Sequence, residues 1–125
     1  MKILHLQLAL ISLFLCSPAQ AHEVEYGTGL ICDTQQQAEQ LVAHLDGDDL
    51  DAAVSAVNAS EHDAKACGIA TVAFVRGPQL ATARSRDATF QVVRILVVGV
   101  STASGLRSVA PAAYVSLFKV REYAV

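Results

Sequence analysis

The stretch from Thr89 to Val100 is the most apolar part of the chain outside its N-terminus. Eight of its twelve residues are apolar, and five of those eight are valine. Valine and isoleucine lose side-chain freedom in a helix and pack well on a pleated surface. The stretch is too short to span a bilayer, and Arg94 interrupts it. It predicts a long strand that is buried on both faces through much of its length and organises the fold.

The N-terminus has the pattern of a secretory signal peptide. Lys2 supplies a positive charge, residues 3–15 are mostly apolar, and Ala19 to Ala21 end the segment with an A-x-A site. Cys16 would be the lipidated residue of a lipoprotein, but Leu15 before it is bulkier than lipoprotein signals tolerate. We therefore expect cleavage after Ala21. Residues 22–125 then form a single domain without a transmembrane segment.

Two cysteines, Cys32 and Cys67, remain after such cleavage. In an exported protein they would meet an oxidising compartment, where a disulfide persists. A redox-active dithiol usually has a close spacing such as C-x-x-C, which these two residues lack. The sequence therefore predicts a structural disulfide, and closing a loop of this length stabilises a fold by about 4 kcal/mol on the chain-entropy model.

Charge divides the chain into an acidic and a basic half. Residues 22–63 contain ten acidic residues and no Lys or Arg, whereas residues 64–125 contain eight basic and two acidic residues. The two halves would complement each other when packed together. The alternative is an exposed basic face for an anionic partner. Because the chain is acidic overall, with a formal net charge of −3, we expect no nucleic-acid partner.

Two short helices are predicted after the first strand. Thr34 and Gln37 form a capping box for the first, whose apolar stripe is Ala38, Leu41, Val42 and Leu45. Gly47 ends this helix, and Asp48 or Asp49 caps the second, which Asn58 closes and whose stripe is Leu50, Ala53, Val54 and Val57. The pair is typical of an αα-hairpin. Its lack of basic residues argues against a DNA-binding helix-turn-helix.

Strands account for most of the remaining chain. Alternating or apolar runs predict them at 26–32, 69–76, 80–84, 89–100, 106–109 and 113–123. Gly77-Pro78 is a turn signal, and Ser101 to Gly105 is a loop of small residues. Short connections require antiparallel pairing. We expect an α+β fold: a twisted antiparallel sheet or small barrel of four to six strands, with the αα-hairpin inserted after the first strand.

Several segments resemble a set of small secreted proteins predicted from the genomes of Gram-negative soil bacteria. These segments are Cys32 to Thr34, Val57 to Ala59, Ala73 to Gly77 and Phe90 to Gly99. The resemblance extends over most of residues 22–125. It implies a periplasmic or secreted location and implies no activity, cofactor or site residue.

Two patterns raise the possibility of a metal site. The acidic segment Asp46 to Asp51 fails as an EF-hand loop, because Leu50 and Val57 stand where oxygen ligands are required. Cleavage after Ala21 would make His22 the N-terminal residue, and its amine and imidazole could bind copper together with His44 or His62. Capped helix starts and solvent-facing histidines explain both patterns, so we expect no metal or other cofactor.

Arg94 lies among apolar residues on one face of the predicted central strand. A buried arginine needs a carboxylate partner, and the candidates are Glu39, then Asp33 and Glu122. The alternative is an anion-binding arginine at a cleft, flanked by the basic residues Arg84, Arg86, Arg107, Lys119 and Arg121. Of these, Arg84, Arg94 and Arg121 are the candidate contacts to an anion or partner.

The sequence contains no motif that identifies a catalytic site. It lacks a G-x-S-x-G motif and a glycine-rich phosphate loop, and its second half contains no histidine. We therefore expect an exported, disulfide-linked accessory or binding module without catalytic activity. Its partner would be an envelope protein or a small anionic ligand. The alternative is a small metal-binding protein or enzyme that uses His22 or the Asp46 to Asp51 segment.

Overall fold

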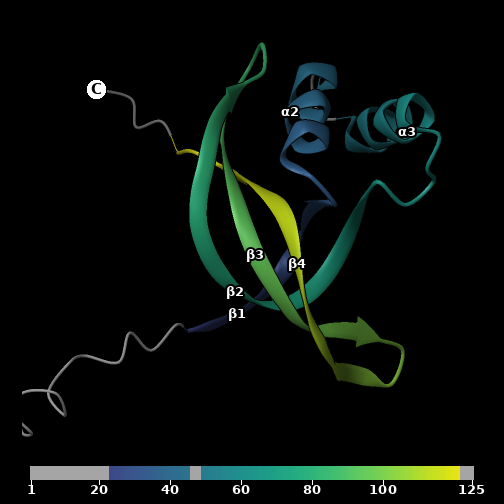
Figure 1. Ribbon diagram of the computed structural model, residues 1–125, viewed down its shortest axis with the longest axis vertical. Helices are drawn as coiled ribbons and strands as arrows, with labels where there is room; N and C mark the ends of the chain where they lie inside the picture. The colour runs from purple at the N-terminus through teal and green to yellow at the C-terminus, as the bar shows by residue number, and fades with distance from the viewer. Residues whose placement is uncertain (1–22, 46–48, 122–125) are drawn as a thin grey trace, which may run out of the picture.

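The computed structural model describes residues 23–45 and 49–121. Strand β1 (Val24–Cys32) is followed by helices α2 (Gln35–His44) and α3 (Leu50–Glu61), and then by strands β2 (Cys67–Arg84), β3 (Thr89–Thr102) and β4 (Gly105–Lys119). Neighbouring strands pair antiparallel in the order β1-β2-β3-β4, and β4 returns to β1 to close a small barrel (Figure 1). The predicted α+β barrel with an αα-hairpin after its first strand is confirmed.

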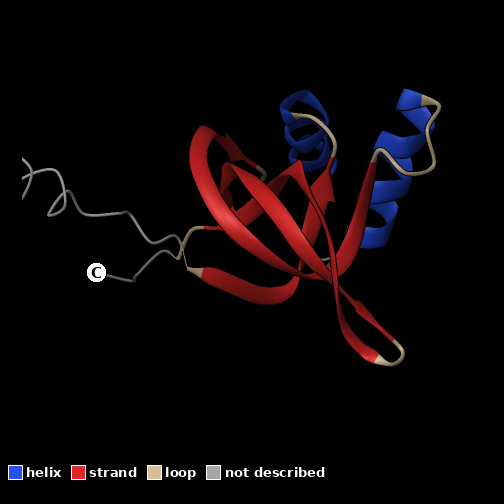
Figure 2. Cartoon of the chain, turned by 60° about the horizontal axis from the view of Figure 1, so that its bottom comes forward, coloured by secondary structure: helices blue, strands red, loops and turns tan. Residues whose placement is uncertain are grey.

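The two helices lie together on one side of the barrel (Figure 2). The predicted capping box is present: the Gln37 backbone N–H donates to Thr34 Oγ1 over 3.2 Å, and the Thr34 N–H donates to Gln37 Oε1 over 3.0 Å. Asp49 caps α3 by accepting from the Ala52 N–H at 3.0 Å. Helix α3 continues past Asn58 to Glu61, so the predicted end of this helix was wrong.

Strand β2 is one long strand where the sequence indicated two strands and a turn. The chain passes through Gly77 and Pro78 without reversing, and the pairing with β3 shifts between Arg76 and Gln79. A Cβ atom on Gly77 would lie 2.8 Å from the Arg94 carbonyl oxygen, so the close approach of β3 requires glycine here. Proline is tolerated at such a bulge because no ladder hydrogen bond needs its missing N–H. The Gly-Pro pair therefore bends a strand instead of ending it.

Strand β4 likewise joins two predicted strands into one. Its pairing with β3 passes from Ser108 opposite Gly99 to Ala112 opposite Val97, so the residues between them, including Pro111, bulge out of the ladder. The β3–β4 turn is tight and ends at Gly105, whose φ of 113° lies in the region that favours glycine. Both long hairpins therefore curve, and this curvature lets four strands close a barrel.

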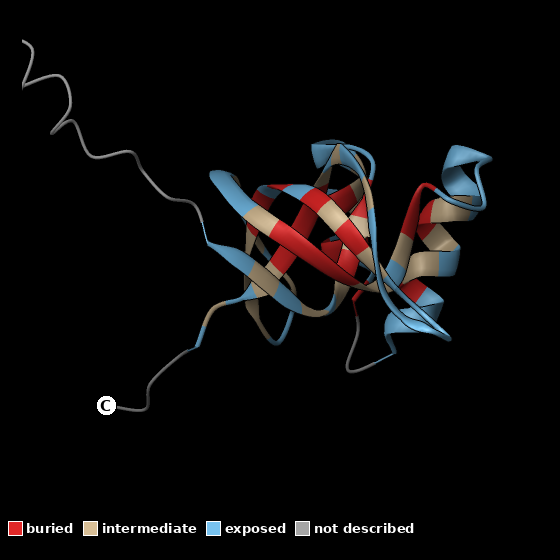
Figure 3. Cartoon of the chain, turned by 90° about the horizontal axis from the view of Figure 1, so that it is seen from below, coloured by how far each residue is buried: buried red, intermediate tan, exposed pale blue. Residues whose placement is uncertain are grey.

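Buried apolar residues form two separate clusters, one on each side of the barrel wall. Figure 3 shows buried residues both along the barrel strands and in the helices. The first cluster lies between the helices and the outer face of the barrel, and its members include Leu30, Cys32, Leu41, Val42, Val57, Val92 and Val115. The second fills the barrel interior and contains Val72, Phe74, Val93, Ile95 and Val97. Alternate residues of one strand enter different clusters, as the pleat requires.

The central strand β3 is not buried on both faces as predicted. Its inward residues from Val93 to Val97 are buried, whereas Val92 is the buried residue of its outer face and Arg94 and Leu96 on that face are exposed. The helices cover the outer face near Val92 and leave the next positions open to solvent. The predicted burial of Arg94 on the core-facing side of this strand was therefore wrong, because Arg94 and Leu96 lie on the exposed part of the outer face.

Within the described ranges, no helix has the length and apolar character needed to cross a membrane. The predicted signal peptide, residues 1–21, and His22 lie outside the residues that the structure describes.

Candidate functional site

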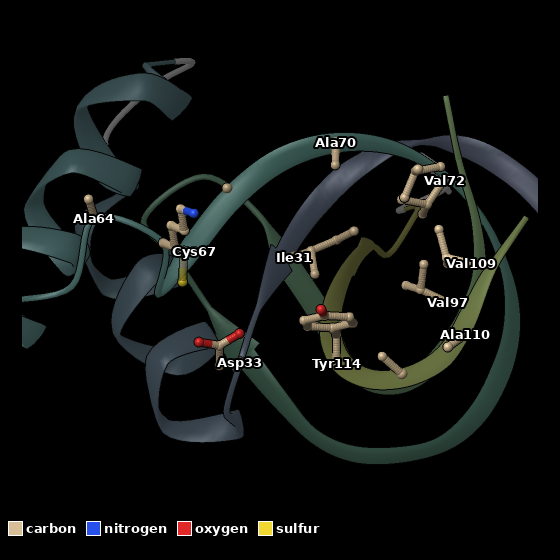
Figure 4. Close-up of a pocket in the computed structure, with 14 residues that line it drawn as sticks. Ile31, Asp33, Ala64, Cys67, Ala70, Val72, Val97, Val109, Ala110 and Tyr114 are labelled. Atoms are coloured by element: carbon tan, nitrogen blue, oxygen red, sulfur yellow. The ribbon is translucent and has the colours of Figure 1, made fainter. Parts of the chain in front are cut away.

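A cavity of about 510 Å³ opens into the barrel between the first residues of β2 and the first half of β4. Small and branched apolar side chains line most of it (Figure 4): Ile31, Ala70, Val72, Val97, Val100, Val109, Ala110 and Ala112. Tyr114 lies against the same space, and two charged residues, Asp33 and Lys65, stand at its edge. The lining comes from all four strands and from the loop before β2. The cavity is therefore a property of the closed barrel.

Small residues at the start of β2 keep this cavity open. Ala70 and Val72 belong to the inward face of β2, and Gly68 follows the same alternation. A Cβ atom on Gly68 would have no other atom within 4 Å. A side chain at residue 68 would therefore occupy space that now belongs to the cavity.

The predicted disulfide is confirmed and lies beside the cavity. Cys32 and Cys67 face each other across β1 and β2, with Cα atoms 4.0 Å apart and a bond between their sulfur atoms. Both residues are buried, and Cys67 also lines the cavity. The bond therefore fixes the two strands where they leave the helical hairpin and form one wall of the site.

Asn58 holds the loop that carries Lys65. Its amide nitrogen donates to the carbonyl oxygens of Ala64 and Cys67, each over 3.0 Å. Its amide oxygen accepts the Cys67 N–H at 2.8 Å. The side chain thus pairs with the Cys67 backbone as a neighbouring strand would. This arrangement links the end of α3 directly to the cavity wall.

A second, smaller space of about 250 Å³ lies where β1 and β4 separate. Its lining includes residues 25–29 of β1 and residues 116–118 of β4. The two strands pair through Ile31 with Ser116 and through Cys32 with Val115. Beyond these pairs, the Ser116 hydroxyl donates to the Leu30 carbonyl oxygen over 2.8 Å. The barrel is therefore closed at one end of β1 and split at the other.

An ion pair borders this split. Arg76 binds Glu25 through two hydrogen bonds of 2.8 and 3.0 Å, and its guanidinium carbon lies 3.8 Å from the centre of the Phe118 ring. The hydrogen bond from Arg76 is the main cause that holds the pKa of Glu25 below its ordinary value, and the same bond raises the pKa of Arg76. Both side chains are about 40% exposed, at 38% and 41%, so solvent screens the pair.

Strand register separates Arg94 from Arg84 among the three arginines predicted to contact an anion or partner, because Arg84 pairs with Thr89 and Arg94 lies five residues further along β3. Arg94 borders a shallow apolar hollow on the outer wall, together with Gly77, Pro78 and Leu96. Arg84 ends β2, and Arg121 follows β4, both exposed. Arg94 forms no ion pair with the described candidates Asp33 and Glu39, and Glu122 lies outside the described residues. The predicted ion pairs of Arg94 with Glu39 and with Asp33 were therefore wrong, and the pairing with Glu122 stays a prediction.

The residues of the alternative metal sites are dispersed where the structure describes them. His44 ends α2 and His62 follows α3, and both are exposed. Asp49 and Asp51 belong to the start of α3, while residues 46–48 lie outside the described ranges. In residues 23–45 and 49–121, no three His, Cys, Asp or Glu side chains gather as metal ligands.

Sequence reasoning missed Asn58 and Arg76. Asn58 was interpreted as the end of a helix, and Arg76 as the last residue of a strand. The partners of Asn58 follow it by six and nine residues, and Glu25 precedes Arg76 by 51 residues. A hint existed for Asn58, because asparagine favours positions where its amide can bond to nearby backbone. No local signal pointed to Arg76.

The sequence matches no family model, and neither the curated proteins nor the solved structures contain a match to it. The chemistry of the cavity therefore follows from its own lining. Apolar walls with a few polar groups at the opening are typical of sites that bind a small molecule and orient one polar end of it.

Proposed function

We propose that this protein is an exported, non-catalytic binding module that holds a small, largely apolar molecule in the mouth of its barrel. The observation that carries this proposal is the cavity of about 510 Å³, because it lies within the usual size range of small-molecule sites. Its walls come from strands whose positions the disulfide and Asn58 restrain, which favours a largely pre-formed site.

The two charges at the opening define the polar end of the ligand. The Lys65 ammonium would attract an anionic group, and the Asp33 carboxylate would attract a donor or cation. Both residues are exposed, so each makes a modest, salt-dependent contribution to binding. A ligand with an apolar body and an anionic or zwitterionic end fits these features.

Export is supported by two observations. The A-x-A site before His22 is typical of signal peptide cleavage, and a Cys32–Cys67 disulfide persists in oxidising compartments. Intact-mass measurement of the protein secreted or recovered from the periplasm should give a chain that begins at His22. A chain that keeps Met1, or one that carries a lipid on Cys16, would contradict export by this route.

A fluorescent probe tests the cavity directly. The neutral fluorophore N-phenyl-1-naphthylamine should bind saturably with increased emission. Gly68→Val should weaken this binding by about tenfold or more, a loss of ~1.4 kcal/mol or more, since the added side chain enters the cavity. Equal binding by the wild type and Gly68→Val, or no saturable binding at all, would contradict the proposal.

The charged rim is tested by changing the probe. The anionic fluorophore 1-anilinonaphthalene-8-sulfonate should lose more affinity than the neutral fluorophore when Lys65→Gln is introduced. Asp33→Asn should have the opposite effect on the anionic probe, because it removes a like charge. Both differences should shrink in high salt, since both side chains are exposed.

A further inference from the structure

Among the residues that the structure describes, no strand neighbours one edge of β1 over most of its length. All nine residues of β1 pair with β2, but on the opposite edge Ile31 and Cys32 alone pair with β4. Alternate residues within 24–29 therefore direct to that edge backbone groups that β4 does not pair, whereas the Leu30 carbonyl oxygen already accepts from the Ser116 hydroxyl. An edge of this kind is a template on which another extended chain can add as a strand.

The smaller space of about 250 Å³ lies directly beside this edge. Successive residues of β1 face the barrel interior and the helices in turn. Ile31 packs in the interior, while Leu30 and Cys32 pack toward the helices. Gly27 and Gly29 therefore belong to the inward face and both line the space. Their missing side chains leave it open. A strand added to β1 would direct alternate side chains toward this space.

The fold itself does not require these two glycines. Neither has a positive φ, and a Cβ atom on Gly27 would meet nothing within 4 Å. On Gly29 it would make an ordinary contact of 3.8 Å with the Ser116 hydroxyl. Glycine weakens a strand and is typical of places where a ligand or another backbone approaches closely. The close approach of a bound peptide would explain why glycine occupies both positions, which the fold by itself does not require.

We propose that the split between β1 and β4 binds an extended peptide segment of a partner protein, which pairs with residues 24–29 and places apolar side chains beside Gly27 and Gly29. Main-chain hydrogen bonds to the β1 edge supply affinity, and the space supplies selectivity for side chains. This site is separate from the barrel mouth, although Ile31 and Val72 line both spaces.

Charge favours an acidic residue in this peptide. Glu25 is the acidic residue of the split, and Arg76 already binds it. Lys119 and Arg121 continue β4 beyond the residues that line the split, and both are exposed. A carboxylate on the peptide beside that end of β4 would be attracted by these two cations. The partner segment is therefore extended, mainly apolar on alternate residues and acidic at one end.

Three hexapeptides of the form acetyl-Asp-X-Thr-X-Thr-X-amide, with X as Val, Leu or Phe, serve as probes. Calorimetry and NMR should show that at least one binds, with amide shifts concentrated in residues 24–29 and 116–118. N-methylation removes alternate main-chain donors of the peptide. Methylation of one alternate set should weaken binding by about tenfold, and methylation of the other should change it little.

Two glycine variants separate this site from the barrel mouth. Gly27→Val should lose peptide binding by about tenfold or more while keeping the affinity for N-phenyl-1-naphthylamine, which also shows that it is folded. Gly68→Val should weaken the binding of N-phenyl-1-naphthylamine and keep the affinity for the peptide. Replacing Asp of the peptide by Lys should weaken binding, most strongly at low salt.

Four results would overturn the proposal: no binding of any of the three peptides at millimolar concentration, equal binding by Gly27→Val, insensitivity to both methylation patterns, or shifts outside the split. Sedimentation of the free protein adds a further check. A dimer whose formation protects residues 24–29 from hydrogen exchange would show that a second copy, and not a partner peptide, uses this edge.

Discussion

The two ends of β1 differ in exposure and in the number of neighbouring strands. Val24 at its beginning is 62% exposed, whereas Cys32 at its end is 1% exposed. Both residues pair with β2, so this difference comes from the other edge of β1 and from the helices. In β1, the buried end is the one that has both a second neighbouring strand and a covering layer of helices.

Different interactions restrain the two ends. The Cys32 end has a disulfide, the ladder to β4, the amide of Asn58 and a covering helical hairpin. The Val24 end has the exposed ion pair of Glu25 with Arg76 and the contact of Arg76 with the Phe118 ring. Covalent and buried contacts contribute several kcal/mol, whereas screened surface contacts contribute at most ~1 kcal/mol. Stability should therefore concentrate at the closed end.

Removal of the disulfide should have the largest effect. Cys32 and Cys67 are separated by 35 residues, for which the chain-entropy model gives a loss of about 4 kcal/mol. Cys32→Ala with Cys67→Ala should lower the free energy of urea unfolding by this amount. Reduction of the wild type should have a similar effect, and reduction of the double variant none. A loss below ~1 kcal/mol would show that the closed end does not depend on its cross-link.

Asn58→Ala should have the next largest effect, with a loss of about 2–3 kcal/mol, because it leaves the Cys67 N–H and carbonyl groups without partners in a partly buried place. Asn58→Asp keeps the acceptor for the Cys67 N–H but loses the two donors, so it should fall between the wild type and alanine. Hydrogen exchange at the Cys67 amide gives a local measurement. Equal stability of all three proteins would contradict the role assigned to Asn58.

Loss of the ion pair at the open end of β1 should have a small effect on the free energy of unfolding, and acid should remove the same contribution. Arg76 lowers the pKa of Glu25 in the folded protein, so the stabilising contribution is complete above the ordinary value of 4.5 and is lost as the pH falls through the lower folded value. Glu25→Gln should cost at most ~1 kcal/mol at pH 7 and should flatten the acid side of the stability profile. Glu39→Gln, on the exposed face of α2, is the matched control and should leave that profile unchanged.

Arg94→Ala should have the smallest effect. Its side chain is exposed on the outer wall beyond the helices, so the free energy of unfolding should change by about 0–0.5 kcal/mol. A loss of 3 kcal/mol or more, typical of a broken buried pair, would show that the outer wall is covered there. An unchanged stability combined with lost ligand or peptide binding would place Arg94 in a binding site.

Local sequence patterns were sufficient for the elements that depend on near neighbours. The capping box of Thr34 and Gln37, the apolar stripe of α2 and the alternating faces of β4 all lie within a few residues of their partners. The predicted stripe of α3 is buried or partly buried except for Leu50, which is exposed. The pairing of Cys32 with Cys67 followed because no other partner remained after the predicted cleavage. From these features we could predict the α+β class, the position of the helical hairpin after the first strand and the disulfide.

Features that depend on distant neighbours could not be predicted in the same way. Gly77-Pro78 is a turn signal by local rules, but the Arg94 carbonyl group across the ladder makes it a bulge in a continuous strand. The exposure of Arg94 depends on where the helical hairpin packs on the outer wall. The cavity depends on how far β2 and β4 separate. None of these distances is encoded in a short segment.

The disulfide has a further consequence because it encloses both helices in one covalent loop. Residues 33–66 lie between the joined cysteines. A protease that cuts once within this loop would therefore leave two pieces that stay attached through sulfur and travel as one molecule until a reductant separates them. The helical hairpin could also vary in length among related chains without changing the connection between β1 and β2. The barrel mouth would then keep its connection between β1 and β2 when the helical hairpin is cut or changes in length.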